Sequence, residues 1–179
     1  YTSRLKPDLA APGSAIPSTR AGYGTESIPM TGTSMSAPHV TGAAALIRQA
    51  RPTWSALEIK AALMNTAART ANGDGVAYPE SRVGAGRVAV IDALATTVIA
   101  RNASASDQVS ISMGALELAA PYTEERRVRL TNKGSQSVTL KITSSNTVGI
   151  TAARMVPLLN QITLSAGQEV AIPFRFEAN

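Results

Sequence analysis

Apolar residues recur every three or four positions in the first half of the chain, which is the period of an amphipathic helix. One run predicts a helix from Pro38 to about Ala50, and Pro52 ends it. Its apolar positions are Val40, Ala43, Ala44 and Ile47. A second helix is predicted over residues 55–67, because Ser55 and Glu58 have the spacing of a capping box. Residues 88–94 suit a short third helix, and the polar, glycine-containing residues 70–80 suit a loop.

After about residue 100 the pattern changes to an alternation of apolar and polar residues with period two. Turn sequences such as "NKGS" and "AGQ" separate the runs. Five strands are therefore predicted, over residues 108–114, 126–132, 137–143, 160–166 and 169–176. One buried face per strand is typical of an antiparallel β-sandwich. Residues 95–107 are the candidate linker between the two halves.

The composition is that of a globular chain, with 179 residues of which 44% are hydrophobic. The net charge of +5 is spread evenly: residues 1–100 hold nine basic and six acidic residues, and residues 101–179 hold eight and six. The tightest basic cluster, "EERRVR" at 124–129, is half neutralised by its own glutamates, which disfavours a nucleic-acid binder. The chain has no cysteine, so disulfides and thiolate metal sites are excluded.

The most apolar stretch, residues 88–100, is interrupted by Asp92 and is shorter than the roughly 20 residues of a membrane-spanning helix. No apolar signal-peptide core is present in the first ten residues. Because the sequence does not start with Met, we expect a processed product or a fragment.

Candidate chemistry lies around Ser34, just before the predicted first helix. A helix N-terminus offers free backbone N–H groups and the positive end of the helix dipole, which suit an oxyanion in acyl transfer. The alternative is that Thr33 or Ser34 only caps the helix. A nucleophilic serine needs a base, and the only histidine is His39. Five residues along a helix it is rotated by about 140° and displaced by about 7.5 Å, so we expect a packing role with one satisfied nitrogen.

Three segments nevertheless resemble the subtilisin-like serine proteases, or subtilases. "GTSMSAPHVTG" at 32–42 is similar to the nucleophile signature of that family, "KPDLAAPGSAIPST" at 6–19 to a segment that precedes it, and "VGAGRVAVIDAL" at 83–94 to a helix near the end of the catalytic domain. The resemblance covers residues 4–95. It implies an α/β fragment, the C-terminal part of a subtilisin-like fold over residues 1–98, followed by a fibronectin type III-like all-β sandwich over 99–179.

By this resemblance Ser34 is the nucleophile, Thr33 lies on the oxyanion side and Met35 flanks the site. The triad order in subtilisin is Asp, His, Ser, so the base and the acid precede the nucleophile. Only 33 residues precede Ser34 here, none is a histidine, and Asp8 does not match the catalytic aspartate. The oxyanion asparagine is missing as well. The resemblance thus implies the C-terminal part of a serine endopeptidase, inactive alone.

Further expectations follow from that family. The partners would be a polypeptide substrate and the missing N-terminal part of the protease domain, and the isolated fragment could self-associate through its uncovered apolar helix face. The location would be secreted. No cofactor or metal is indicated in this chain, although structural calcium occurs elsewhere in many subtilases.

Two rival interpretations stay open. "GAGRVA" at 84–89 fits a dinucleotide-binding fingerprint, but that motif requires a preceding hydrophobic strand and "YPESR" is not one. The second rival is a non-catalytic β-sandwich that acts as a binding or interaction module. Its aromatic residues are only Tyr122, Phe174 and Phe176, which favours core packing over an aromatic binding platform. Asn102 begins a glycosylation sequon, "NAS".

Overall fold

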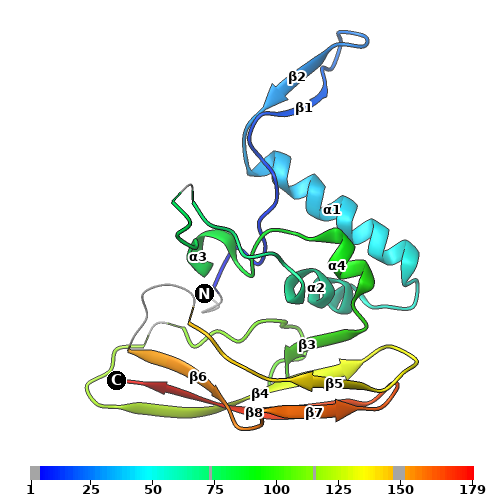
Figure 1. Ribbon diagram of the computed structural model, residues 1–179. Coiled ribbons are helices and arrows are strands. Elements are labelled where there is room, and N and C mark those ends of the chain that lie inside the picture. Colours follow the sequence, from blue (N-terminus) through cyan, green and yellow to red (C-terminus); the bar gives the residue numbers. More distant parts are fainter. Residues whose placement is uncertain (1–4, 73, 115, 147–151) are drawn as a thin grey trace.

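The computed structural model describes residues 5–72, 74–114, 116–146 and 152–179 (Figure 1). Residues 1–4 and 73 of the predicted peptidase region lie outside the described residues. The first half holds a hairpin and four helices: β1 (Ile16–Thr19), β2 (Ser27–Met30), α1 (Thr33–Ala50), α2 (Ala56–Asn65), α3 (Glu80–Val83) and α4 (Val90–Ala95). The helical half lies on one side of the β-sheet region formed by the second half.

The first helix begins earlier than its apolar period indicates. Its first residue is Thr33, so Pro38 lies inside the helix instead of starting it. Proline has no backbone N–H, which leaves the Ser34 carbonyl without its usual intrahelical donor. The second helix begins as predicted: Ser55 Oγ accepts from the Glu58 amide (3.2 Å), and the Ser55 amide donates to Glu58 Oε2 (2.7 Å). The predicted capping box is confirmed.

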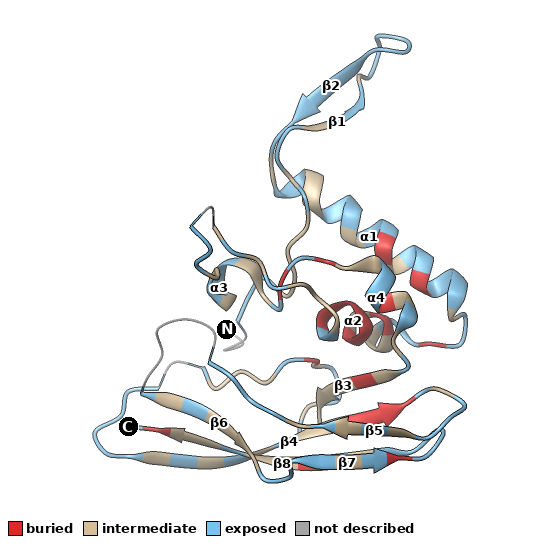
Figure 2. Cartoon of the chain, in the orientation of Figure 1, coloured by how far each residue is buried: buried red, intermediate tan, exposed pale blue. Residues whose placement is uncertain are grey.

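Three elements of the first half were not predicted. The hairpin β1–β2 carries a proline in each strand, lacks a clear alternation, and exposes all four residues of β2. Figure 2 shows this hairpin projecting from the body with almost no buried residue. The third is α3, a single turn that follows the predicted loop. Neither the hairpin nor α3 contributes a fully buried side chain, so hydrophobic patterning could not reveal them.

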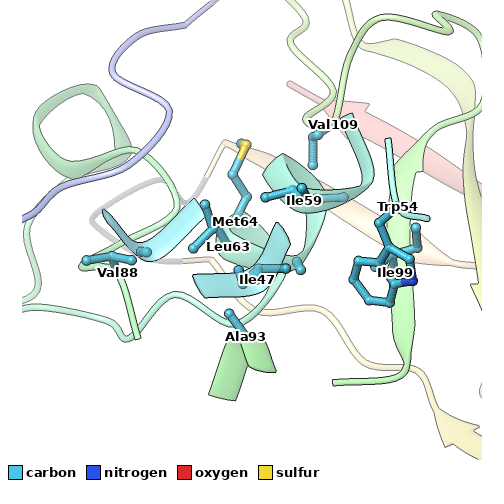
Figure 3. Packing of buried hydrophobic residues seen from close by; sticks show 12 residues of the cluster. Ile47, Trp54, Ile59, Leu63, Met64, Val88, Ala93, Ile99 and Val109 are labelled. Atoms are coloured by element: carbon cyan, nitrogen blue, oxygen red, sulfur yellow. The ribbon is translucent and has the colours of Figure 1, made fainter. Parts of the chain in front are cut away.

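Helices α1, α2 and α4 enclose the first hydrophobic core (Figure 3). Its larger buried side chains are Ile47, Trp54, Ile59, Leu63, Met64, Val88, Ile99 and Val109. Ile47 and Ile99 are fully buried. Two of the members, Ile99 and Val109, come from the segment that follows the helices.

The second half forms two antiparallel sheets. The larger has the order β3 (Val98–Asn102), β4 (Tyr122–Asn132), β8 (Glu169–Ala178), β6 (Ala153–Pro157), and the smaller pairs β5 (Val138–Lys141) with β7 (Gln161–Leu164). Leu130 and Ile172 of the larger sheet and Leu164 of the smaller share one buried cluster. The prediction of an all-antiparallel β-region after an α/β fragment is therefore confirmed.

Four of the five predicted strands exist, and one does not. Residues 108–114 form no strand, because Val109 is buried against the helices instead of a sheet. The predicted linker 95–107 is not a simple linker, since it contains β3. Strand β6 was not predicted; its burial pattern lacks a clean alternation.

Strand β3 joins the two halves. Its alternate side chains face opposite ways, so Ile99 enters the helical core while Val98 and Ala100 pack on the sandwich core. The Ala100 amide donates to Asn65 Oδ1 at the end of α2 (2.7 Å). The predicted boundary between residues 98 and 99 thus falls within a strand that serves both cores, and the division into two domains stays a prediction.

We expect Ile99→Ala to destabilise both halves together, by about 3 kcal/mol, because a large side chain of β3 is lost from the helical core, to which both halves contribute. Urea unfolding followed by Trp54 fluorescence and by far-ultraviolet circular dichroism measures this. Trp54 is the only tryptophan and reports the helical core. The two signals should shift in concert. Ile91→Ala is the matched control. Ile91 is 82% exposed, so this substitution should change the free energy of unfolding by less than about 0.5 kcal/mol. Separate transitions would contradict a shared core.

A partly buried ion pair closes the same junction. Lys133 Nζ, just after β4, lies 2.7 Å from Glu58 Oε1 of α2. Burial raises the pKa of Glu58, but hydrogen bonds from Lys133 and Ser55 and the Lys133 charge outweigh it and hold the pKa below its ordinary value of 4.5.

A carboxyl with a lowered folded-state pKa stabilises the fold fully above its unfolded-state value, and this contribution is lost as the pH falls through the folded-state value. We therefore expect unfolding free energy to decrease below about pH 4.5, and Glu58→Gln to remove about 1 kcal/mol at pH 7 and to flatten this dependence. Glu26→Gln is the control, because its pair with Arg20 is exposed. An unchanged acid dependence in Glu58→Gln would refute the role of this pair.

Candidate active site

Ser34 is the second residue of α1 and is exposed to solvent. The helix N-cap is Gly32, and no side chain caps the helix end, so the interpretation of Thr33 or Ser34 as a capping residue is wrong. Within the described part of the chain the Ser34 hydroxyl makes no hydrogen bond. Amides of the first helical turn have no intrahelical acceptor, and the Ser34 amide is one of them. The hydroxyl therefore stands free at the positive end of an 18-residue helix.

Residues 31–36, here called the serine turn, are held by the segment of residues 11–15. The Gly32 amide donates to the Gly13 carbonyl (2.8 Å), and the Ala15 amide donates to Thr31 Oγ1 (2.8 Å). From the other side of Ser34, Ser36 Oγ donates to the Ala11 carbonyl (2.9 Å).

Gly13 has no room for a side chain at this contact. A Cβ built there would lie 2.7 Å from the Gly32 carbonyl oxygen and would overlap Ser36 Oγ. The two backbones can approach this closely only because residue 13 is glycine. Sequence reasoning singled out neither Gly13 nor Ser36; a small residue and a hydroxyl are too common to indicate such a contact without the structure.

The motif of residues 83–94 packs on residues 8–10, which directly precede the segment of residues 11–15. The Ala85 amide donates to the Asp8 carbonyl (3.0 Å), the Ala10 amide to the Gly86 carbonyl (2.9 Å), and the Val88 amide to the Ala10 carbonyl (2.9 Å). Gly84 has a φ of 60°, and a Cβ there would lie 2.5 Å from the Pro7 carbonyl oxygen. Close backbone packing thus explains the "GAG" glycines. They follow α3 and not a strand, so the dinucleotide interpretation is wrong.

His39 does not serve Ser34. Its Nδ1 donates to the Met35 carbonyl one turn earlier (2.8 Å), and in the described residues no hydrogen bond joins it to Ser34. One nitrogen is satisfied as expected, but the ring is exposed and is not a packing residue.

Asp8 is engaged elsewhere. Its carboxylate pairs with Lys60 of α2 (2.9 Å) and with Lys6. Partial burial raises the pKa of Asp8, but the hydrogen bonds and charges of Lys6 and Lys60 outweigh it and lower the pKa overall. Because its carboxylate binds Lys60 of α2 and Lys6, Asp8 anchors its own segment to that helix.

An open, mainly apolar depression lies beside the serine turn. It is lined by Ile16, Pro17 and Ser18 of β1 and by Met35, Pro38 and His39 of α1. Met35 is half-buried, whereas Thr33 and Ser34 are exposed. The site is therefore open to solvent on the side of the hairpin.

No group of three or more His, Cys, Asp or Glu side chains gathers among the described residues to hold a metal ion. In the same part of the chain, no helix combines the length and apolarity needed to cross a membrane.

The close packing at Gly13 gives a direct test of how the serine turn is held. We expect Gly13→Ala to destabilise the protein by about 2 kcal/mol, because the added methyl overlaps Ser36 and the Gly32 backbone. Gly42→Ala is the control: a methyl there meets nothing within 4 Å on exposed α1, and should stabilise by about 0.5–1 kcal/mol. Thermal unfolding measures both. Equal effects of the two substitutions would contradict the contact.

Comparison with known proteins matches this half of the chain to one family. Residues 1–86 match the Subtilase family, Peptidase_S8. Minor extracellular protease Vpr of Bacillus subtilis (strain 168) is 44% identical over 101 residues, covering 52% of this chain and 12% of that protein. A subtilisin-like protease of Arabidopsis thaliana, SBT1.9, is 51% identical over 74 residues, covering 35% and 10%. Alkaline elastase YaB of Bacillus sp. (strain YaB) is 46% identical over 65 residues, covering 36% and 17%.

The resemblance to subtilases over the first half is thus confirmed. The chain spans less than a fifth of the length of these relatives. The family match ends at residue 86, before the β-region, so the fibronectin type III-like identity of that region is not tested by it.

Proposed function

We propose that residues 1–98 are the C-terminal part of a subtilisin-like serine endopeptidase domain and that Ser34 is its nucleophile. The observation that supports this most is the mutual packing of the three motif segments, which leaves Ser34 at the exposed N-terminus of α1. An ordinary surface serine would need no such support. The family match over residues 1–86 agrees with this assignment.

In the proposed reaction Ser34 Oγ attacks the carbonyl carbon of a peptide bond, and its proton passes to a general base. The carbonyl oxygen becomes an oxyanion, toward which the Ser34 amide and the α1 dipole supply positive charge. Collapse of the intermediate expels the amine, which takes the proton from the base. Water then hydrolyses the acyl-serine and restores the hydroxyl. Thr33, exposed beside Ser34, lies on the oxyanion side in this scheme.

The base, the acid that orients it and the oxyanion asparagine belong to polypeptide outside these 179 residues. His39 is the only histidine and is turned back onto its own helix, and Asp8 is bound to two lysines. Leu46 of α1 and Ile28 and Met30 of β2 are exposed apolar side chains, and we propose that they belong to the surface that contacts that polypeptide. In its absence we expect this surface to promote self-association.

Other parts of the proposal rest on the family alone. The β-region is proposed to be fibronectin type III-like, and the protein to be secreted, as the name of the Vpr relative suggests for that protein. Structural calcium is proposed only for the remainder of the peptidase. Met35, half-buried beside Ser34, makes methionine oxidation a route to loss of activity.

The nucleophile is tested in two settings with a fluorophosphonate probe and a peptide substrate. The chain alone should neither hydrolyse the peptide nor label rapidly, because an unactivated hydroxyl is a weak nucleophile. A chimera of Vpr that carries residues 1–98 of this chain in place of its matching region should label at Ser34 and cleave the peptide.

Controls separate the serine from its surroundings. In the chimera Ser34→Ala should abolish labelling and lower peptide hydrolysis by at least about a thousandfold. Ser81→Ala, an exposed serine of α3, should change neither. Rapid stoichiometric labelling of the chain alone would contradict the external base, and a chimera that remains active with Ser34→Ala would contradict the assignment of the nucleophile.

A further inference from the structure

The outer face of the four-stranded sheet carries many charged residues. Paired residues of neighbouring strands point to the same face, and so do every second residue along a strand. Leu130 of β4 and Ile172 of β8 point into the sandwich core. The residue next to each along its strand therefore points outward, as do Arg129 and its partner Ala171. Near the start of β3 this outer face is covered by the helical half, where Ile99 lies buried.

Five arginines of this face form a diagonal, here called the arginine stripe: Arg101 of β3, Arg129 and Arg127 of β4, Arg175 of β8 and Arg154 of β6. Arg101, at the end near the helical half, is 19% exposed, and the other four are more open. Arg101 pairs with Arg129, Arg175 with Glu125, and Arg154 with Glu177. With strands about 4.8 Å apart and a rise of about 3.4 Å per residue, successive stripe positions lie about 5–8 Å apart over about 25 Å.

The stripe holds more positive charge than its own carboxylates neutralise. Glu169 is shared by Arg129 (2.5 Å) and Arg101 (3.9 Å). Glu177 is shared by Arg154 and Arg175 (2.6 Å each), and Arg127 pairs with Glu125 (3.1 Å). Five guanidinium groups thus face three carboxylates, which leaves an excess charge of +2.

This arrangement of arginines contributes little to the stability of the fold. Arg101 and Arg129 are direct cross-strand neighbours, where like charges are destabilising. The outer guanidinium groups are open, with Arg127 59% and Arg154 69% exposed, and exposed ion pairs contribute little. Each guanidinium has five N–H donors, so an incoming carboxylate can bind without displacing the existing pairs.

We propose that the arginine stripe binds an acidic polypeptide segment in extended conformation. Alternate residues of such a segment are about 6.8 Å apart, which matches the spacing of the stripe. Besides the charged residues, the outer face presents small or short side chains such as Thr123, Ala171 and Pro173. It has no aromatic side chain on which nucleic-acid bases could stack. Apart from the buried Ile99, its largest apolar side chain is Val156, which is too little to enter a lipid surface. Binding at the stripe requires no chemistry at Ser34.

The test uses the full chain and a fluorescein-labelled peptide of alternating Glu and Ser, measured by fluorescence anisotropy at several salt concentrations. The double variant R127Q/R175Q should weaken binding about tenfold and reduce its salt dependence. The control R20Q/R48Q removes the same charge from the hairpin and from α1, which contribute no residue to the sheet pairs, and should leave binding within about twofold. Ser34→Ala should bind like the parent, which separates this site from the proposed catalysis.

Three results would overturn the proposal. The first is absence of binding to the acidic peptide at low salt. The second is equal weakening by the stripe and control variants, which would indicate a response to net charge alone. The third is tighter binding of a sulfated polysaccharide or a single-stranded oligonucleotide of equal charge, which would assign the stripe to a different polymer. Matching circular dichroism spectra and melting temperatures of the variants exclude loss of fold as the cause.

Discussion

The candidate site depends on the close approach of one short segment to two others. Residues 8–13 lie between the serine turn and the glycine turn of residues 84–86, and backbone hydrogen bonds hold them on both sides. Glycine at positions 13 and 84 makes these approaches possible, because a Cβ at either would overlap the facing backbone. The start of α1, and with it Ser34, is therefore placed by contacts far apart in sequence. The helix dipole then supplies the electrostatics that the proposed chemistry uses.

Strand β3 makes the two halves of the chain depend on each other. Ile99 belongs to the helical core, while its neighbours Val98 and Ala100 belong to the sandwich core. The Asn65 side chain and the Glu58–Lys133 pair add polar contacts across the same junction. The β-region thus buries surface of the helical half that would otherwise face water, and its outer sheet face stays free for the arginine stripe.

The sequence predicted the elements whose signals are local. The capping box at Ser55 and the long alternating strands β4 and β8 appear where the patterns place them, because each pattern reports burial on one face. The start of α1 was placed too late, since Thr33 and Ser34 are exposed and carry no apolar period. Residues 108–114 alternate like a strand, but Val109 is drawn to a core formed by distant residues. The contacts at Gly13 and Ser36 depend on tertiary packing and left no signal in composition or spacing.

Amide hydrogen exchange followed residue by residue by nuclear magnetic resonance tests the central claim most directly. If the three segments hold the serine turn, the amides of Gly32, Ala10, Ala85 and Val88 exchange slowly and are released in one cooperative opening, because each donates across these contacts. A Gly32 amide that exchanges as fast as one in an open loop, while Ala10 and Val88 stay protected, would contradict the claim that these contacts position Ser34.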